Sequence, residues 1–427
     1  MAPIEDHPLR YRLANELHAR PFPSMQAPSA AIYVAFKQPE MAANRDRGKD
    51  LEHLHDLLDR HGVAHPQPGA THYYGQIGKH WLKWEQHTEF VTYTIFTDGV
   101  APRPFEAAAF DPFPQDWLDK APGQRITSIL VRVEERPDVD EIETRLADWF
   151  VPESLAVSAV LDDAAVVAGD FRIDTNGHMR FSVFVGDDTG ERRVGRIVQR
   201  LCEIETYKTM SMLGFARVRG MGSQLGELDT RLTTLVEEMS QEGSKAEQTL
   251  QALLAISAEL ETLSAQSSFR FGATWAYEAL VTERISALRE ERHNGRQTFL
   301  EFMVRRYQPA MRTVRSAQER LDAMSARGVR AANLLRTRVD VERSAQNQAL
   351  LESMDRRSDL QLRLQRTVEG LSVVAISYYA VSLASYLLYP LEAPTGLSKN
   401  MLTAVVTVPV VLLVWGLVRR LRKSVEK

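Results

Sequence analysis

Two long uncharged runs constrain this chain more than any other feature. Neither Leu371–Leu391 nor Met401–Val418 contains a charged residue. An α-helix needs about 20 apolar residues to cross the roughly 30 Å hydrocarbon core of a bilayer. The second run is slightly short and contains Pro409, which a membrane helix tolerates where neighbours satisfy the freed carbonyl. We therefore predict a two-helix transmembrane hairpin within residues 370–420. A buried hairpin in a soluble core is the alternative.

Basic residues on either side of the runs predict the orientation of this hairpin. The loop at 392–400 contains one Glu and one Lys, whereas arginines and a lysine flank the two runs: Arg363, Arg366, Arg419, Arg420, Arg422 and Lys423. Cytoplasmic flanks of membrane helices are rich in Lys and Arg. The first residues show no basic region followed by an apolar run, so we expect no signal peptide. For a bacterium, this predicts a multi-pass inner-membrane protein with cytoplasmic N- and C-termini and a basic tail at 421–427.

The remaining composition limits the classes of partner and cofactor. The formal net charge is -4, which gives no reason to expect nucleic acid as a partner. Cys202 is the one cysteine, so the chain can form neither an intrachain disulfide nor a cysteine-based metal site. The composition is typical of a reducing compartment.

Residues 190–369 have the pattern of a helical, coiled-coil-like stalk. Proline is absent from Glu191 to Gln308, and Met311–Thr367 contains one glycine and no proline. The latter run predicts a continuous helix of about 85 Å, at 1.5 Å per residue, that leads into the first span. We expect Gly222–Ser223 to end a helix, Gly243–Ser244 to form a bend, Gln266–Ser268 to form a connection, and Pro309 to kink or restart the chain.

A seven-residue repeat runs through the start of this stalk. Val314, Leu321, Gly328 and Leu335 are seven apart, but Glu342 and the polar trio Gln346–Gln348 interrupt the repeat. A long dimeric coiled coil has a cleaner seam. The pattern therefore favours packing against neighbouring helices or in a higher homo-oligomer. Lysine is absent between Lys245 and Lys399 while arginine is plentiful, which indicates ion pairs between helices.

Residues 1–189 predict an α/β domain with a mixed sheet. Apolar or alternating segments predict strands at 30–36, 81–96, 126–133, 154–161, 164–171 and 179–186, with Asp162–Asp163 as a hairpin turn. Helical spacing predicts helices at 45–61 and 138–150. The whole chain is then of the α+β class, with an α/β domain, a helical stalk and the hairpin.

Motifs that would indicate an enzyme are absent from the sequence. It contains no Gly-x-Gly-x-x-Gly, Walker loop, Gly-x-Ser-x-Gly or His-Glu-x-x-His. We therefore expect no catalytic, cofactor-binding or metal-ligating residues, and the sequence identifies no cofactor. His53, His55 and Asp56 could meet a metal ion, but exposed helix histidines are the better interpretation.

One polar group in the N-terminal domain has two interpretations. In the predicted strand 81–96, Glu85, His87 and Glu89 alternate onto one face. A histidine between two carboxylates holds its proton more tightly, and it could act as a general acid or form part of a metal site. We favour a structural clamp in which His18 or Arg20 lies near His87 or Glu89 and ties the N-terminal segment to the sheet.

Four stretches resemble a known family. They are His7–Pro21 (HPLRYRLANELHARP), Trp84–Phe90 (WEQHTEF), the segment from Leu334 to Arg357, and Gln361–Tyr379 (QLRLQRTVEGLSVVAISYY). Together they resemble a bacterial family of predicted membrane-anchored proteins of unknown function. The resemblance covers nearly the whole chain and implies the topology above, but no activity.

The order of the segments is similar to that of the CorA family of magnesium and cobalt transporters. In that family the stalk and first span line a pentameric pore, and a Gly-Met-Asn motif lies at its outer mouth. The loop Tyr389–Met401 departs from this motif. The resemblance implies a homo-oligomeric ion channel or transporter with a metal cation as the transported ion.

Three functions follow from these patterns. In a CorA-like channel, Tyr378, Ser382, Ser385 and Tyr389 would line the pore, because they fall on one face of the first span. The same serines could instead allow close helix packing. The alternative function is a membrane-anchored scaffold or sensor without transport activity, with the lipid bilayer as partner. An enzyme using Glu85, His87 and Glu89 has the least support, since no nucleophile accompanies them.

Overall fold

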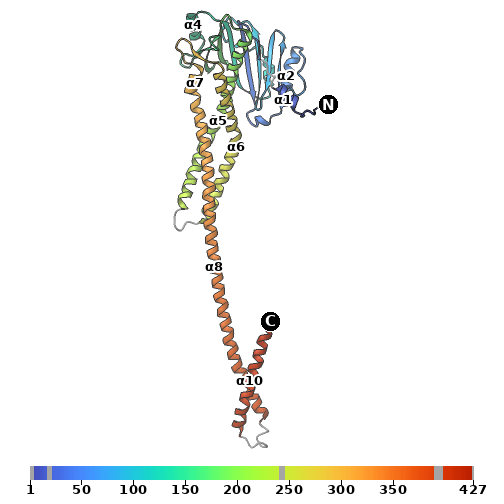
Figure 1. Cartoon of the computed structure of the whole chain (residues 1–427), viewed down its shortest axis with the longest axis vertical. Helices are drawn as coiled ribbons and strands as arrows, with labels where there is room; N and C mark the ends of the chain where they lie inside the picture. The colour runs from blue at the N-terminus through green and yellow to red at the C-terminus, as the bar shows by residue number, and fades with distance from the viewer. Residues whose placement is uncertain (1–3, 17–21, 240–245, 389–397, 426–427) are drawn as a thin grey trace. The chain divides into compact units, whose positions relative to one another are not determined.

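The chain forms two compact units, which we describe separately. The computed structural model describes residues 4–16, 22–239, 246–388 and 398–425 (Figure 1). Residues 1–242 and 251–331 make up the first unit, called the head unit below. Residues 243–250 and 332–427 make up the second, called the tail unit.

A nine-stranded mixed sheet forms the centre of the head unit, in the order β2-β3-β4-β1-β5-β8-β7-β6-β9. Strands β5 and β8 pair in parallel, and the other neighbouring strands pair antiparallel. The strands are β1 (Ser29–Lys37), β2 (His72–Ile77), β3 (His80–Gln86), β4 (Phe90–Asp98), β5 (Gln124–Glu135), β6 (Ala156–Val160), β7 (Ala165–Ile173), β8 (Met179–Val185) and β9 (Glu291–Arg292). The prediction of a mixed α/β domain is confirmed.

Strand β1 shows how the sequence alternates between two covered faces. Ile32 and Val34 pack into a core that contains Leu54 of α2 (Arg47–Arg60). Tyr33 points the other way and hydrogen-bonds Thr206 of α5 (Glu191–Glu238). Side chains alternate between faces with period 2, so a strand covered on both faces is apolar throughout. This explains the uninterrupted apolar run at 30–36.

Most predicted strands and helices of this domain agree with the structure, and one strand was wrong. Strands β1, β5, β6, β7 and β8 lie where they were predicted, and so do α2 and α4 (Val139–Trp149). Asp162 and Asp163 connect β6 and β7 with positive φ angles of 58° and 62°, as a tight hairpin turn requires. The single strand predicted at 81–96 is instead the hairpin of β3 and β4, which turns at 87–89. The turn at 87–89 contains no Gly, Pro, Asn or Asp, so no turn signal marks it in the sequence.

The head unit also contains five short helical elements among its described residues. They are α1 (Arg10–Glu16), η1 (Ala42–Asn44), η2 (Ala107–Phe110), α3 (Gln115–Leu118) and α7 (Phe299–Arg306). A capping box at Thr298 and Glu301 begins α7. Helix α8 (Gln308–Leu388) then starts just before Pro309, so the predicted restart at this proline is confirmed.

Two predicted helix ends were wrong. Helix α5 continues through Gly222–Ser223, and α6 (Ala246–Ser286) continues through Gln266–Ser268. Glycine costs a helix about 1 kcal/mol, which tertiary packing outweighs. Leu225, Leu228 and Leu232 are buried here, as are Leu253, Ile256 and Leu260. Figure 1 shows α5 and α6 side by side with the first part of α8. The predicted bend at Gly243–Ser244 lies outside the described residues.

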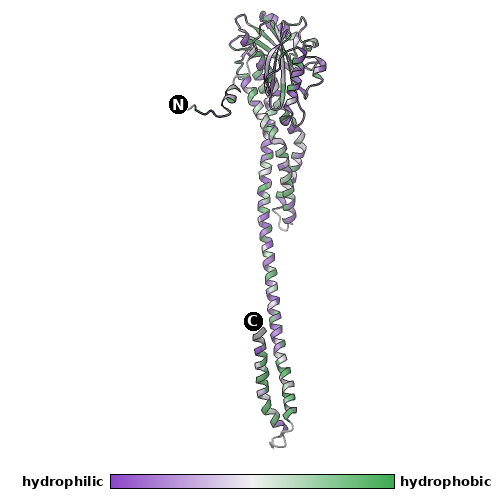
Figure 2. Cartoon of the chain, turned by 90° about the vertical axis from the view of Figure 1, so that its right-hand side faces the viewer, coloured by the Kyte–Doolittle hydropathy of each residue, from purple (hydrophilic) through white to green (hydrophobic). Residues whose placement is uncertain are grey.

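The tail unit consists chiefly of the rest of α8 and of α10 (Lys399–Val425). Helix α8 continues without a break through residue 370, so the predicted stalk leads directly into the first apolar run. The end of α8 and α10 are both long and apolar enough to cross a membrane, as the hydropathy colours show (Figure 2). Ser377 of α8 and Val414 of α10 are buried, which is consistent with contact between the two helices.

Candidate functional site

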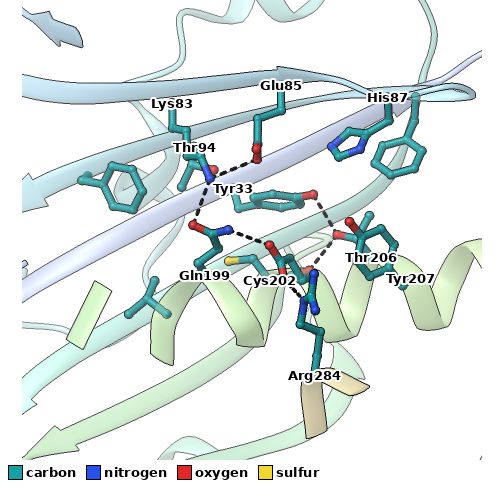
Figure 3. Close-up of a pocket in the computed structure, with 14 residues that line it drawn as sticks. Tyr33, Lys83, Glu85, His87, Thr94, Gln199, Cys202, Thr206, Tyr207 and Arg284 are labelled. Carbon is teal, nitrogen blue, oxygen red and sulfur yellow. Dashed lines mark hydrogen bonds and ion pairs between the residues drawn. The ribbon is translucent and has the colours of Figure 1, made fainter. Parts of the chain in front are cut away.

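A partly open cavity lies between the sheet and the helices of the head unit (Figure 3). Its volume is about 190 Å³. Strands β1, β3 and β4 form one wall, and α5 and the end of α6 form the other. Ligand pockets for drug-sized molecules have volumes of about 300–1,000 Å³. The cavity therefore fits a molecule of amino-acid size rather than a nucleotide.

A chain of ion pairs and hydrogen bonds crosses this cavity. The Lys83 ammonium lies 3.2 Å from a Glu85 carboxylate oxygen. It also donates a 2.9 Å hydrogen bond to the Gln199 amide oxygen. The Gln199 amide nitrogen donates to Glu203 over 2.6 Å, and Arg284 pairs with the other oxygen of Glu203. Two cations and two carboxylates thus balance one another, although Lys83 is only 4% exposed.

Hydroxyl and thiol groups complete the wall but supply no nucleophile. The Thr206 hydroxyl donates to the Cys202 carbonyl, and its oxygen lies 2.8 Å from the Tyr33 hydroxyl oxygen in a second hydrogen bond. Burial raises the pKa of the Cys202 thiol and raises the pKa of Tyr33 well above its ordinary value. Cys202 therefore stays a neutral thiol at physiological pH, which is the unreactive form. The arrangement suits binding rather than covalent chemistry.

Aromatic rings form one end of the cavity. The His87 ring stacks on Phe90, with ring centroids 4.3 Å apart. Phe90 contacts Tyr207, and Tyr207 stacks on Tyr277. Figure 3 shows Tyr33, His87 and Tyr207 around the same space. Aromatic faces of this kind attract organic cations.

The three polar residues predicted to share a strand face belong to two different networks. Glu85 and His87 line the cavity, whereas Glu89 pairs with Arg270 of α6 and accepts a 3.3 Å hydrogen bond from Tyr277. The turn at 87–89 breaks the strand alternation on which the prediction relied. His18 and Arg20 lie outside the described residues, so the clamp to His87 or Glu89 stays a prediction.

The segment between Lys245 and Lys399 is rich in arginine and lacks lysine, and this was the one sequence signal for the ion pairs that its arginines form. Arg270 reaches the sheet at Glu89, Arg284 reaches α5 at Glu203, and Arg320 of α8 reaches α5 at Asp229. Each pair joins elements far apart in sequence. The composition indicated ion pairs between helices, but it could not identify the partners, since they depend on the tertiary arrangement.

His53 is the clearest error among the predicted surface residues. It was expected to be an exposed helix histidine, yet it is only 6% exposed and stacks on Trp117 at 4.0 Å. Its Nε2 lies 3.0 Å from the Trp117 carbonyl and its Nδ1 lies 2.9 Å from the Tyr93 hydroxyl. Burial lowers its pKa to about 4, so it is neutral. Among the described residues, no group of three or more His, Cys, Asp or Glu side chains could hold a metal ion.

A second, wider cleft of about 630 Å³ lies near η2 and the start of β8. Its wall includes Arg125 and His178, whose ring stacks on Phe110. His178 Nδ1 lies 2.7 Å from the Ser128 hydroxyl. Ser128 does not line the cleft and is only 4% exposed. The Ser–His pair therefore orients the histidine and does not present a nucleophile.

The predicted pore face of α8 is only partly outward-facing within the tail unit. Tyr378 is 70% exposed, whereas Ser382 and Ser385 are half-buried. The Ser385 hydroxyl is shielded and has no hydrogen-bond partner among the described residues. Ser377, which the sequence did not single out, is more buried than either. Tyr389 lies outside the described residues.

Comparison with known proteins identifies the family. No curated protein and no solved structure matches the chain. One family model matches residues 5–425, which is nearly the whole length. The chain therefore belongs to the family described as Protein of unknown function (DUF3422).

Proposed function

We propose that this protein is a membrane-anchored sensor whose head unit binds a small zwitterionic molecule. The observation that carries this proposal is the cavity lined by two cations and two carboxylates, one pair on the strand wall and one pair on the helix wall. The sequence predicts no catalytic role, and the neutral Cys202 thiol is consistent with binding alone. The head unit then acts as a binding module rather than as an enzyme.

The charges in the cavity favour a ligand with both signs of charge. Within the cavity, Lys83 pairs with Glu85, and Arg284 pairs with Glu203. A ligand with one charge would break a pair and leave a shielded charge without a partner, which is costly. An amino acid can offer a carboxylate to the cations and an ammonium group to the carboxylates. The aromatic end of the cavity would add attraction for the ammonium group.

Two helices that are long and apolar enough to cross a membrane support the anchor. Their large side chains are exposed, for example Leu383 at 66% and Leu413 at 65%, so they need an apolar surrounding. We place both chain ends in the cytoplasm, on the basis of the flanking arginines. Reporter fusions at Thr395 and after Lys427 test this, and an external Lys427 would refute the orientation.

Ligand binding is tested on the purified full chain by thermal unfolding and calorimetry. The probes are α-amino acids, each compared with the amine and the carboxylic acid of the same skeleton. We expect stabilisation by an amino acid but by neither analogue, of about 2.7 kcal/mol at 100 times its Kd. Equal effects of all three probes, or none, would refute the proposal.

Matched variants locate the binding site. Lys83→Met and Glu203→Gln should abolish the ligand-dependent shift. Glu143→Gln should retain it, because Glu143 forms a similar ion pair with Arg296 that does not line the cavity. Loss of the shift in Glu143→Gln as well would indicate a general effect on folding rather than binding in this cavity.

A homo-oligomeric ion pathway for a metal cation is the second candidate. The exposed Tyr378 and the half-buried Ser382, two polar side chains on α8, favour it. Replacing Ser382 and Ser385 with leucine should block cation flux in liposomes without preventing membrane insertion, since leucine is favourable in hydrocarbon. Equal flux in parent and variant, or a monomeric protein, would exclude this candidate.

A further inference from the structure

The part of α8 between residues 346 and 372 is an isolated helix with a large uncovered apolar surface. Every residue here is exposed except Glu369, which is half-buried. Leu350 and Met354 are each 59% exposed, Leu364 is 69%, Val368 is 53% and Leu371 is 66%. Helices in proteins obtain most of their stability from packing an apolar face. A surface of this kind therefore requires a partner.

These residues follow a seven-residue repeat. Leu350, Arg357, Leu364 and Leu371 are seven apart, and so are Asn347, Met354, Gln361 and Val368. The two rows are offset by three and four residues, which is the spacing of the seam in a left-handed coiled coil. The repeat is out of step with the earlier one through Leu321 and Leu335, and it begins at Asn347, within the polar trio.

Charge divides the helix into two sides along this repeat. We define the seam face as the two rows, together with the residue before each member of the Asn347 row and the residue after each member of the Leu350 row. It comprises 16 of the 27 residues, and Arg357 is its one charged residue. The other 11 residues carry seven charges: Glu352, Asp355, Arg356, Asp359, Arg363, Arg366 and Glu369. The division is far sharper than a solvent-exposed helix needs.

We propose that copies of this chain associate in parallel and in register along the seam face. Parallel symmetric packing places each residue beside its own copy, where like charges repel; a face with one charge in 16 meets that condition. The proposal rests on the membrane anchor proposed above, which would hold all copies in one direction and at one height. The same two rows continue into the first span at Tyr378, Ser382 and Ser385, so the contact can extend into the bilayer.

Arg357 and Gln361 form a polar layer within this seam. Polar residues at seam positions commonly set register and oligomer number at a cost in stability. The layer would oppose slipped pairings, which would bring Arg357 against Leu350 or Leu364. Arg357→Leu should therefore raise the thermal stability of the oligomer and reduce its uniformity of size.

Cysteine cross-linking tests the face, the direction and the register together. Cys202 is buried and is replaced by alanine to give a cysteine-free full chain. Leu364→Cys places a thiol on the seam face, and Leu362→Cys places one on the charged side, where the leucine is 52% exposed. In cell membranes under mild oxidation we expect disulfide cross-links between two copies of the chain at position 364, and few at position 362. Equal yields at both sites, or cross-links at 364 to another protein only, would overturn the proposal.

The charge variants Leu364→Asp and Leu362→Asp form a second matched pair. Sedimentation of the full chain in mild detergent should show that only Leu364→Asp loses the oligomer. An unchanged oligomer in Leu364→Asp would contradict the seam. Carbonate extraction of membranes reports on the anchor separately: a membrane-bound but monomeric wild type refutes self-association alone. If carbonate extracts the wild type while copies of the Leu364→Cys variant still cross-link to one another, the anchor is refuted and the seam contact stands.

Discussion

Acidification is expected to destabilise the head unit through His53. This ring lies in the main core of the sheet, between Trp117 and Tyr93. The Trp117 carbonyl can only accept a hydrogen bond, so Nε2 carries the proton and Nδ1 accepts from the Tyr93 hydroxyl. A second proton on Nδ1 would reverse that bond, so that Nδ1 donates to the Tyr93 hydroxyl, and would place a positive charge in the core.

The size of the effect follows from proton linkage. Burial lowers the pKa of His53 from 6.5 to about 4 in the folded protein. Between these values the unfolded chain binds a proton that the folded chain does not, so stability falls as the pH falls. The interval of about 2.5 pKa units corresponds to about 3 kcal/mol. Below pH 4 this residue contributes no further loss.

Thermal unfolding of the full chain at several pH values is the assay. Tryptophan fluorescence is a direct probe, because Trp84 and Trp117 lie in the same core. At about 2–4 °C per kcal/mol, His53 accounts for roughly 6–12 °C of the fall in Tm between pH 6.5 and 4. His53→Gln keeps a donor but cannot titrate, so its Tm should fall less over this interval.

A cavity variant provides the control. Leu57→Ala, in the same core, should lower the unfolding free energy by about 2–5 kcal/mol at every pH, because it removes buried methyl groups and no titratable group. Parallel pH profiles for wild type and His53→Gln would refute the reasoning. A changed slope in Leu57→Ala would show that any core damage alters the pH response.

Three further predictions concern the head unit. Glu89→Gln should lower the unfolding free energy by about 3 kcal/mol, measured by urea unfolding, because it leaves the Arg270 guanidinium without its buried partner. Gly214→Ala should destabilise by about 1–3 kcal/mol, since its methyl group would lie 2.2 Å from the Thr274 hydroxyl oxygen; Thr274→Ala should partly rescue it, and equal stability of the single and double variants would contradict this. Cys202 should react with maleimide only after unfolding, because it is buried and its pKa is raised; rapid labelling of the native protein would contradict its burial.

The candidate cavity shows which residues of a site a sequence pattern can identify and which it cannot. The sequence singled out Glu85 and His87 as one polar face, and both line the cavity. Their companions Lys83, Glu203 and Arg284 were not identified, because they meet through contacts between a strand and two helices. A spacing rule describes residues on one element, whereas this network depends on how three elements pack.

The sequence alone determined the features that depend on local composition. An uncharged run predicts a helix suited to hydrocarbon, a long proline-free segment predicts a continuous helix, and alternation predicts strands, because each follows from backbone geometry and solvent. Tertiary structure decided what local pattern leaves open. It split the run at 81–96 into two strands, carried α5 through Gly222, and buried His53 against Trp117. Packing against distant residues decided each case, and at Gly222 it outweighed a helix cost of about 1 kcal/mol.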